Sequence, residues 1–130
     1  MHIKKIFASA IVLSGSFIFF STGCVNNKKD VLYACDSTNV SYSKTVQPII
    51  KANCYNCHSN ANATNLGGSI VLESYSDINN WIDITPNSDG GTLVNDIKHL
   101  GNPMPKNQPK LSDCDITKIA NWVKEGGLNN

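Results

Sequence analysis

The run Cys54-Tyr55-Asn56-Cys57-His58 constrains this 130-residue chain more than any other feature of its sequence. In a C-x-x-C-H run, two thiols add to the two vinyl groups of haem, and the two-residue spacing matches those vinyls when the segment is helical. The adjacent His58 then lies under the iron as its proximal ligand. The run therefore predicts one haem c per chain, bound covalently through Cys54 and Cys57. The length of the chain is enough for one small domain and not for two.

Paired cysteines have two other common uses, and the surrounding sequence fits both less well. A thioredoxin-like C-x-x-C follows a strand of a βαβ unit, whereas here a helix-like stretch precedes the motif. A zinc site needs further Cys or His residues at ligand spacing. Beyond Cys24 and outside the motif only His99, Cys35 and Cys114 remain for that purpose, and none belongs to a second C-x-x-C pair. A chance match is the third alternative, and haem attachment is favoured over all three.

Met104 is the first candidate for the second axial ligand of the iron. Beyond residue 23 the chain contains one methionine, Met104, and two histidines, His58 and His99. Prolines on both sides of Met104 disfavour helix and stiffen an extended loop. A thioether held in such a loop can present its sulfur to iron, as in His/Met cytochromes. His99 is the alternative ligand, although a histidine at the end of a helix commonly interacts with the helix terminus.

The N-terminus has the order of a targeting segment. Lys4-Lys5 precedes the uncharged and mostly apolar stretch 6–20, which is followed by Ser21-Thr22-Gly23-Cys24. This order predicts a secretory signal peptide over residues 1–23. The apolar stretch is shorter than the roughly 20 residues that span a bilayer. Small residues directly before Cys24 resemble the lipobox of bacterial lipoproteins, which implies lipidation of Cys24. Soluble secretion and an uncleaved anchor are the alternatives.

Residues 24–34 are predicted to be the lipidated N-terminus and a polar tether, and residues 35–130 the folded domain. Lipid chains on Cys24 would hold the protein on a membrane surface, not across the membrane. The tether extends at most roughly 35 Å, so the domain would stay close to that surface. The expected location is the cell envelope, facing the periplasm or the cell exterior.

Cysteine counting leaves one further pair. The chain has five cysteines; Cys24 is assigned to lipid, and Cys54 and Cys57 to haem. The remaining two, Cys35 and Cys114, would be in an oxidising compartment, where a disulfide can persist. We favour a disulfide that joins the two ends of the domain, with two free structural thiols as the alternative.

Helical periodicity precedes the C-x-x-C-H motif. Val46, Ile49 and Ile50 recur at helical spacing before Cys54. Pro48 is tolerated only within a first turn, so the helix is expected to begin near residues 45–47.

A second amphipathic helix is predicted near the C-terminus. Its apolar residues follow the spacing i, i+3, i+4, i+7 at Ile116, Ile119, Ala120 and Val123. Ser112 or Asp113 is a plausible N-cap, Asp115 suits the first turn, and Gly126-Gly127 ends the helix. Trp122 is expected to pack at the edge of the apolar stripe. The two helices are expected to pack on each other.

The middle of the chain is predicted to form short helices and loops. A helix is predicted over residues 92–99, and a further short helix within residues 72–84, around Trp81. Residues 60–68 and 86–91 are rich in Asn, Gly, Ser and Thr and are predicted to be loops. No strand pattern of any length occurs, so the predicted class is all-α.

This arrangement resembles the class I cytochrome c domain: a helix that runs into C-x-x-C-H, short helices and loops, a methionine loop and a C-terminal helix. The resemblance covers residues 40–127, and the chain looks like small membrane-bound bacterial members. It implies N- and C-terminal helices packed around one haem, with His58 and Met104 as axial ligands. Ile49 or Ile50 takes the place of the aromatic residue usual in the first helix. The Cys35/Cys114 pair is not general to the family.

Composition and motifs together predict an electron carrier and not an enzyme. The sequence contains no arginine, and beyond residue 23 it has nine lysines and ten acidic residues, a net charge of −1. Nucleic acid is therefore not an expected partner. Iron with both axial positions filled transfers electrons without binding substrate, so the expected partners are redox proteins of a respiratory chain. The alternative is a haem protein with an open or labile sixth site, acting as a sensor or a peroxidase-like enzyme.

Overall fold

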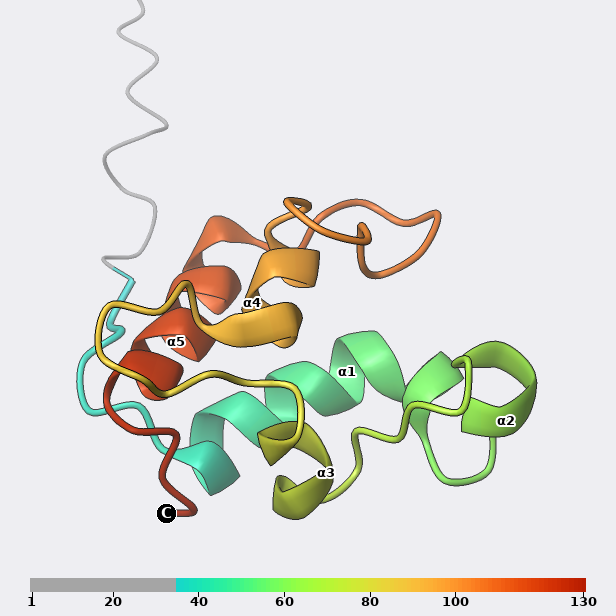
Figure 1. The fold of residues 1–130 in the computed structure, drawn as a ribbon, viewed down its shortest axis with the longest axis horizontal. Helices are drawn as coiled ribbons and strands as arrows, with labels where there is room; N and C mark the ends of the chain where they lie inside the picture. Colours follow the sequence, from blue (N-terminus) through green and yellow to red (C-terminus); the bar gives the residue numbers. More distant parts are fainter. Residues whose placement is uncertain (1–34) are drawn as a thin grey trace, which may run out of the picture. The chain divides into compact units, whose positions relative to one another are not determined.

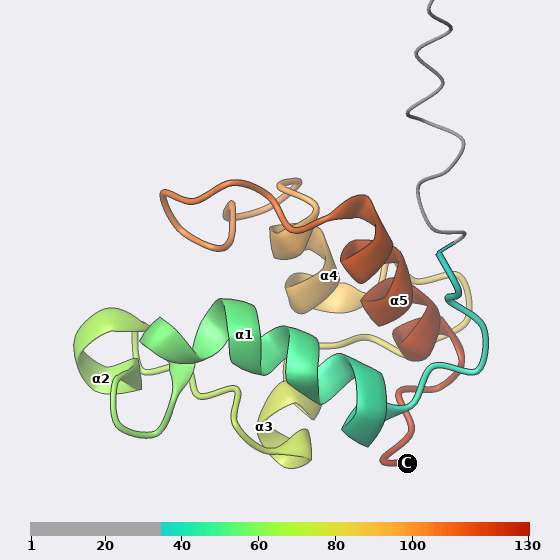
Figure 2. The same cartoon turned by 180° about the vertical axis from the view of Figure 1, so that it is seen from behind.

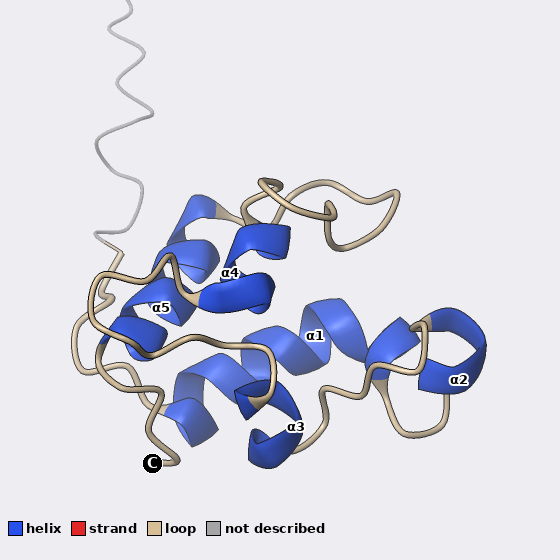
Figure 3. Cartoon of the chain, in the orientation of Figure 1, coloured by secondary structure: helices blue, strands red, loops and turns tan. Residues whose placement is uncertain are grey.

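The computed structural model describes residues 35–130, and all regular structure in this range is helical (Figures 1 and 3). The elements are η1 (Tyr42–Val46, a π-helical turn), α1 (Gln47–His58), α2 (Ala63–Leu66), α3 (Tyr75–Asn79), α4 (Gly91–Ile97) and α5 (Asp113–Lys124). The absence of strands from this range agrees with the predicted all-α class. None of the helices in it is long and apolar enough to cross a membrane. The predicted signal peptide, Cys24 and the predicted tether lie outside the described residues.

The α-helix that carries the C-x-x-C-H motif begins at Gln47, within the predicted start at residues 45–47, and the π-helical turn η1 precedes it. The Ser41 hydroxyl accepts a hydrogen bond from the Lys44 backbone N–H at 3.4 Å and caps η1. The turn η1 continues directly into α1, whose second residue, Pro48, has no N–H to donate to the preceding turn. The π-helical turn thus adds helical backbone over residues 42–46, before the α-helix that the sequence predicted.

Helix α5 packs against η1 and α4 (Figures 1 and 2). Its predicted caps are confirmed: the Ser112 hydroxyl accepts from the Asp115 N–H at 3.0 Å, and Gly126 follows the last turn with a φ of 104°. Trp122 was predicted at the edge of the apolar stripe, but only 1% of its surface is exposed. It lies in the core shared by η1, α1 and α5, together with Val46, Ile50, Ile119 and Val123.

Three aromatic side chains meet where η1 and α5 pack. The ring centroid of Tyr42 lies 5.8 Å from that of Trp122 and 5.3 Å from that of Tyr75, the second pair in an edge-to-face arrangement. The sequence interpretation placed Ile49 or Ile50 in the aromatic position of the first helix. Ile50 is buried, but the helical run also supplies an aromatic ring, Tyr42, from the turn before α1.

The hydroxyl groups of Tyr42 and Tyr75 differ in their partners, which gives a matched pair of variants. The buried Tyr42 hydroxyl has no hydrogen-bond partner among the described residues, whereas the Tyr75 hydroxyl donates to the Gly127 carbonyl at 2.8 Å. An unpaired buried hydroxyl is destabilising, so Tyr42→Phe is expected to raise the free energy of unfolding by about 1 kcal/mol and Tyr75→Phe to lower it by about 1 kcal/mol. Urea denaturation measures both. Equal losses in the two variants would contradict this prediction.

The short helices α2 and α3 differ from the sequence prediction in one place each. Helix α3 falls within residues 72–84 as expected but ends at Asn79, so Trp81 follows it. Residues 60–68 contain a one-turn helix, α2, where only a loop was predicted. The Ser59 carbonyl accepts from the Ala63 N–H at 2.8 Å, and Ala63 is buried. Burial of this one side chain and local backbone hydrogen bonds thus favour a helical turn in a segment of loop-like composition.

The disulfide between Cys35 and Cys114 is present, with the two Cα atoms 5.6 Å apart. It joins the first described residue to the first turn of α5. This confirms the pairing favoured by cysteine counting, and it links two points that are 79 residues apart in the sequence.

Candidate functional site

One cleft of about 640 Å³ is lined by Cys54, Cys57, His58 and Met104. The remaining lining comes from Asn53, from residues within 66–72, from Trp81, from one side of α4 and from the loop 102–107. In Figures 1 and 2 the chain between α4 and α5 extends above the C-terminal half of α1. The volume lies within the range of about 300 to 1,000 Å³ that is usual for small-molecule and cofactor sites.

The two cysteines of the motif carry free thiols and lie one turn apart on α1, so they share one face of the helix. Both are half-buried in the wall of the cleft. Burial, with the nearby Cys57 thiol as a smaller cause, raises the pKa of Cys54 to about 11. At neutral pH the Cys54 side chain is therefore an uncharged thiol.

His58, the last residue of α1, is oriented by the chain that follows α2. Its Nδ1 lies 2.9 Å from the Ile70 carbonyl oxygen. Because a carbonyl only accepts, Nδ1 is the donor, and in the neutral imidazole Nε2 then keeps its lone pair. Histidines that bind metals usually have one ring nitrogen held in this way, which fixes the orientation and tautomer of the ring. The Leu72 N–H also donates to the His58 carbonyl at 2.8 Å, so two hydrogen bonds join this segment to the end of α1.

Gly67 allows this segment to approach His58 closely. A Cβ atom at Gly67 would lie 2.5 Å from the Cys57 carbonyl oxygen and 3.0 Å from the His58 Nδ1. Sequence interpretation missed both Gly67 and Ile70, because Gly67-Gly68 in an Asn-rich stretch indicated only a loop. The adjacent glycines were the signal available for a close backbone approach.

Gly67→Ala is expected to displace the His58 ring, because the new methyl group would meet the backbone of α1 and the imidazole. Overpacking of this kind costs about 1 to 3 kcal/mol. Gly68→Ala is the matched control: a Cβ there meets nothing within 4 Å, although its φ of 60° makes alanine unfavourable by about 1 to 2 kcal/mol. Both variants should lose stability, and only Gly67→Ala should shift the NMR signals of the His58 ring. An unchanged His58 ring signal in Gly67→Ala would contradict this.

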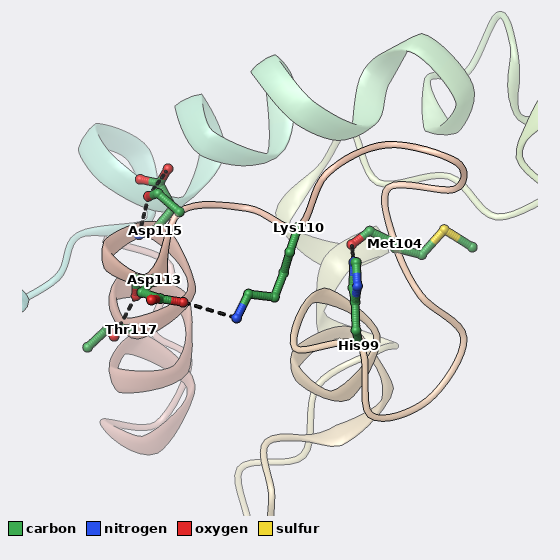
Figure 4. Close-up of polar contacts among 7 residues, drawn as sticks. His99, Met104, Lys110, Asp113, Asp115 and Thr117 are labelled. Atoms are coloured by element: carbon green, nitrogen blue, oxygen red, sulfur yellow. Dashed lines mark hydrogen bonds and ion pairs between the residues drawn. The ribbon is translucent and has the colours of Figure 1, made fainter.

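Met104 lies in the loop between α4 and α5, half-buried, in the wall of the cleft. Its backbone N–H donates to the Asp96 carbonyl at 3.1 Å, and its peptide bond to Pro105 is cis. Figure 4 shows its thioether extending away from His99. The structure thus places on one cleft the four residues that the sequence assigned to haem.

His99 does not line the cleft. Its Nε2 lies 3.2 Å from the Met104 carbonyl oxygen (Figure 4) and must donate, since the carbonyl accepts. Helix α4 ends at Ile97, capped by Lys98, so the predicted helical end at His99 was two residues too far. The reason is the left-handed conformation of His99, whose φ is 61°.

The cleft wall is mainly apolar and carries little charge. Besides His58, its titratable charged residues are Asp96 and Lys106, of opposite sign. Among residues 35–130, no group of three or more His, Cys, Asp or Glu side chains is arranged to hold a metal ion. The described part of the chain therefore gives no support to the zinc interpretation.

Comparison with protein families, with curated proteins and with solved structures gives no match for this chain. The resemblance to class I c-type cytochromes therefore depends on the motif, the methionine loop and the terminal helices of the chain itself.

Proposed function

We propose that this protein is a monohaem c-type cytochrome that carries single electrons in the cell envelope. The observation that carries the proposal is that Cys54, Cys57, His58 and Met104 line the same cleft. These residues come from two segments about 50 positions apart in the sequence. His58 and Met104 are of the two residue types that bind the iron axially in His/Met cytochromes.

The residues of the cleft fit a covalently held haem. Cys54 and Cys57 have free thiols for the two thioether bonds, and the protonated Nδ1 of His58 leaves its Nε2 available to iron. Gly67 provides space where any side chain would press on His58. When bound, the haem would supply an iron that changes between the ferrous and ferric states.

The chain's own side chains then favour electron transfer over catalysis. His58 and Met104 would fill both axial positions, so that no substrate reaches the iron. Leu72, Leu93 and Ile97 are buried beside the cleft and limit access of water, which is one of the ways in which a protein sets a haem potential. On this proposal the fold is that of class I cytochromes c, with the helical run 42–58 and α5 as its paired terminal helices.

The test is a haem stain and an absorption spectrum of the protein made in a host with c-type maturation machinery. Covalent haem survives denaturation, so the denatured polypeptide should stain, and the ferric spectrum should show a sulfur-to-iron charge-transfer band. The double variant Cys54→Ala, Cys57→Ala should lose the stain. A denatured wild-type chain that does not stain would overturn the proposal.

The envelope location is part of the proposal and depends on residues 1–24. Lipid on Cys24 would hold the electron carrier beside membrane-bound redox partners of a respiratory chain. Incorporation of a labelled fatty acid into the wild type, and its loss in Cys24→Ala, is the expected result. Equal labelling of the two proteins would contradict lipidation at this residue.

A further inference from the structure

The turn that ends α4 contains an unfavourable residue at its left-handed position. The His99 N–H donates to the Asp96 carbonyl at 3.0 Å and the Leu100 N–H to the Asn95 carbonyl at 2.9 Å, which is the Schellman pattern of helix ends. This pattern places its C′ residue in the left-handed conformation, where glycine is preferred and other residues cost about 1 to 2 kcal/mol. Here that residue is His99.

Helix α5 ends in the same pattern and uses glycine. The Gly126 N–H donates to the Val123 carbonyl at 3.0 Å and the Gly127 N–H to the Trp122 carbonyl at 2.9 Å, with Gly126 in the left-handed position. The two helix ends are thus built alike, but only α5 has the residue that the backbone favours. The backbone of the α4 turn does not explain why its C′ residue is histidine, so the side chain requires another explanation.

The His99 ring and Asp96 hold the backbone of Met104 from both sides. The Met104 N–H donates to the Asp96 carbonyl at 3.1 Å, and the Met104 carbonyl accepts from the His99 Nε2 at 3.2 Å. The Asp96 carboxylate also accepts from the Asn102 N–H at 2.8 Å. Both polar groups of the Met104 backbone are therefore fixed by the C-terminal turn of α4, which itself lines the cleft.

We propose that His99 and Asp96 are positioning residues that hold the Met104 thioether in the cleft and determine how strongly it competes with other ligands for the iron. This inference rests on the proposed function. His99 is then not an alternative iron ligand: its Nε2 donates to Met104, and the residue does not line the cleft.

His99→Gly separates this role from a structural one. Glycine suits the left-handed turn, so the thermal midpoint of the holoprotein should stay the same or rise. Without the imidazole, Met104 should be held less firmly, and external imidazole should bind the ferric protein about fivefold more tightly. A fivefold change corresponds to about 1 kcal/mol, the usual net value of one hydrogen bond. The charge-transfer band should weaken in parallel.

Three further variants of the holoprotein complete the test. Asp96→Ala removes the acceptor for Asn102 and should change imidazole affinity in the same direction. His99→Gln keeps an N–H donor at similar reach and should restore much of the wild-type behaviour. Leu100→Ala is the control, because that side chain is 74% exposed and does not line the cleft; its imidazole affinity should equal that of the wild type.

The outcomes distinguish this inference from the proposed function. A wild-type protein without covalent haem would overturn both, whereas one with covalent haem but without the sulfur-to-iron band would overturn the positioning role. A wild type with that band, and a His99→Gly variant with unchanged imidazole affinity, would overturn the positioning role and leave the proposed function intact. If the wild type shows the spectrum of two histidine ligands and His99→Gly abolishes that spectrum, His99 binds the iron. This result also overturns the positioning role.

Discussion

Met104→Ala is expected to remove the sulfur-to-iron charge-transfer band and to open the sixth coordination position. The loop holds the thioether of Met104 at the cleft and so gives it a high effective concentration. Loss of a tethered ligand of this kind should raise the affinity for external imidazole by a factor on the order of 10² or more. The reduction potential should fall, because methionine ligation raises the potential of a c-type haem.

Two comparisons make this result interpretable. Met104→Leu keeps an apolar side chain of similar volume without a sulfur ligand, so it should reproduce the spectral change with less loss of stability. The effect should also exceed that of His99→Gly, which removes one contact to the loop and not the ligand itself. An unchanged spectrum and unchanged imidazole affinity in Met104→Ala would favour the alternative of an open or labile sixth site. In that case peroxidase activity of the wild-type protein is the next measurement.

Local sequence signals were enough to predict the helix and the loop that carry the proposed ligands. The C-x-x-C-H motif needs only a helix; the apolar spacing before Cys54 indicated one, and Pro48 indicated where it begins. The prolines around Met104 indicated a loop. Ser112 and Gly126 marked the ends of α5 because caps act within one turn. These signals depend on residues that are close in the sequence.

The residues that were missed depend on contacts between distant segments. Trp122 is buried because Tyr42 packs on it from 80 positions earlier, and periodicity along α5 alone does not reveal this. Gly67 is required by its approach to His58 after the chain has turned back through α2. His99 ends α4 in a left-handed turn that its residue type does not favour, and its partner, Met104, lies across a loop. Tertiary contacts outweighed local preference in each case.

Removing the disulfide should have the largest effect on stability outside the site. In the chain-entropy description, a bridge between Cys35 and Cys114, 79 residues apart, restricts the unfolded chain by about 4 to 5 kcal/mol. That is a large part of the total stability of a small domain, about 5 to 15 kcal/mol. The double variant Cys35→Ala, Cys114→Ala avoids a leftover thiol, and its unfolding in guanidinium should begin at a much lower denaturant concentration.

A nearby control separates this effect from a general disturbance of the start of α5. Lys110 and Asp113 form an exposed ion pair at 3.0 Å (Figure 4). Exposed pairs contribute about 0 to 1 kcal/mol, so Lys110→Ala should change little. Because Cys35 and Cys114 do not line the cleft, the haem spectrum of the double variant should match that of the wild type below its unfolding transition. A loss of stability under about 1 kcal/mol would show that the bridge does not restrict the unfolded chain as described. An altered spectrum would mean that the link between the first described residue and α5 also supports the methionine loop.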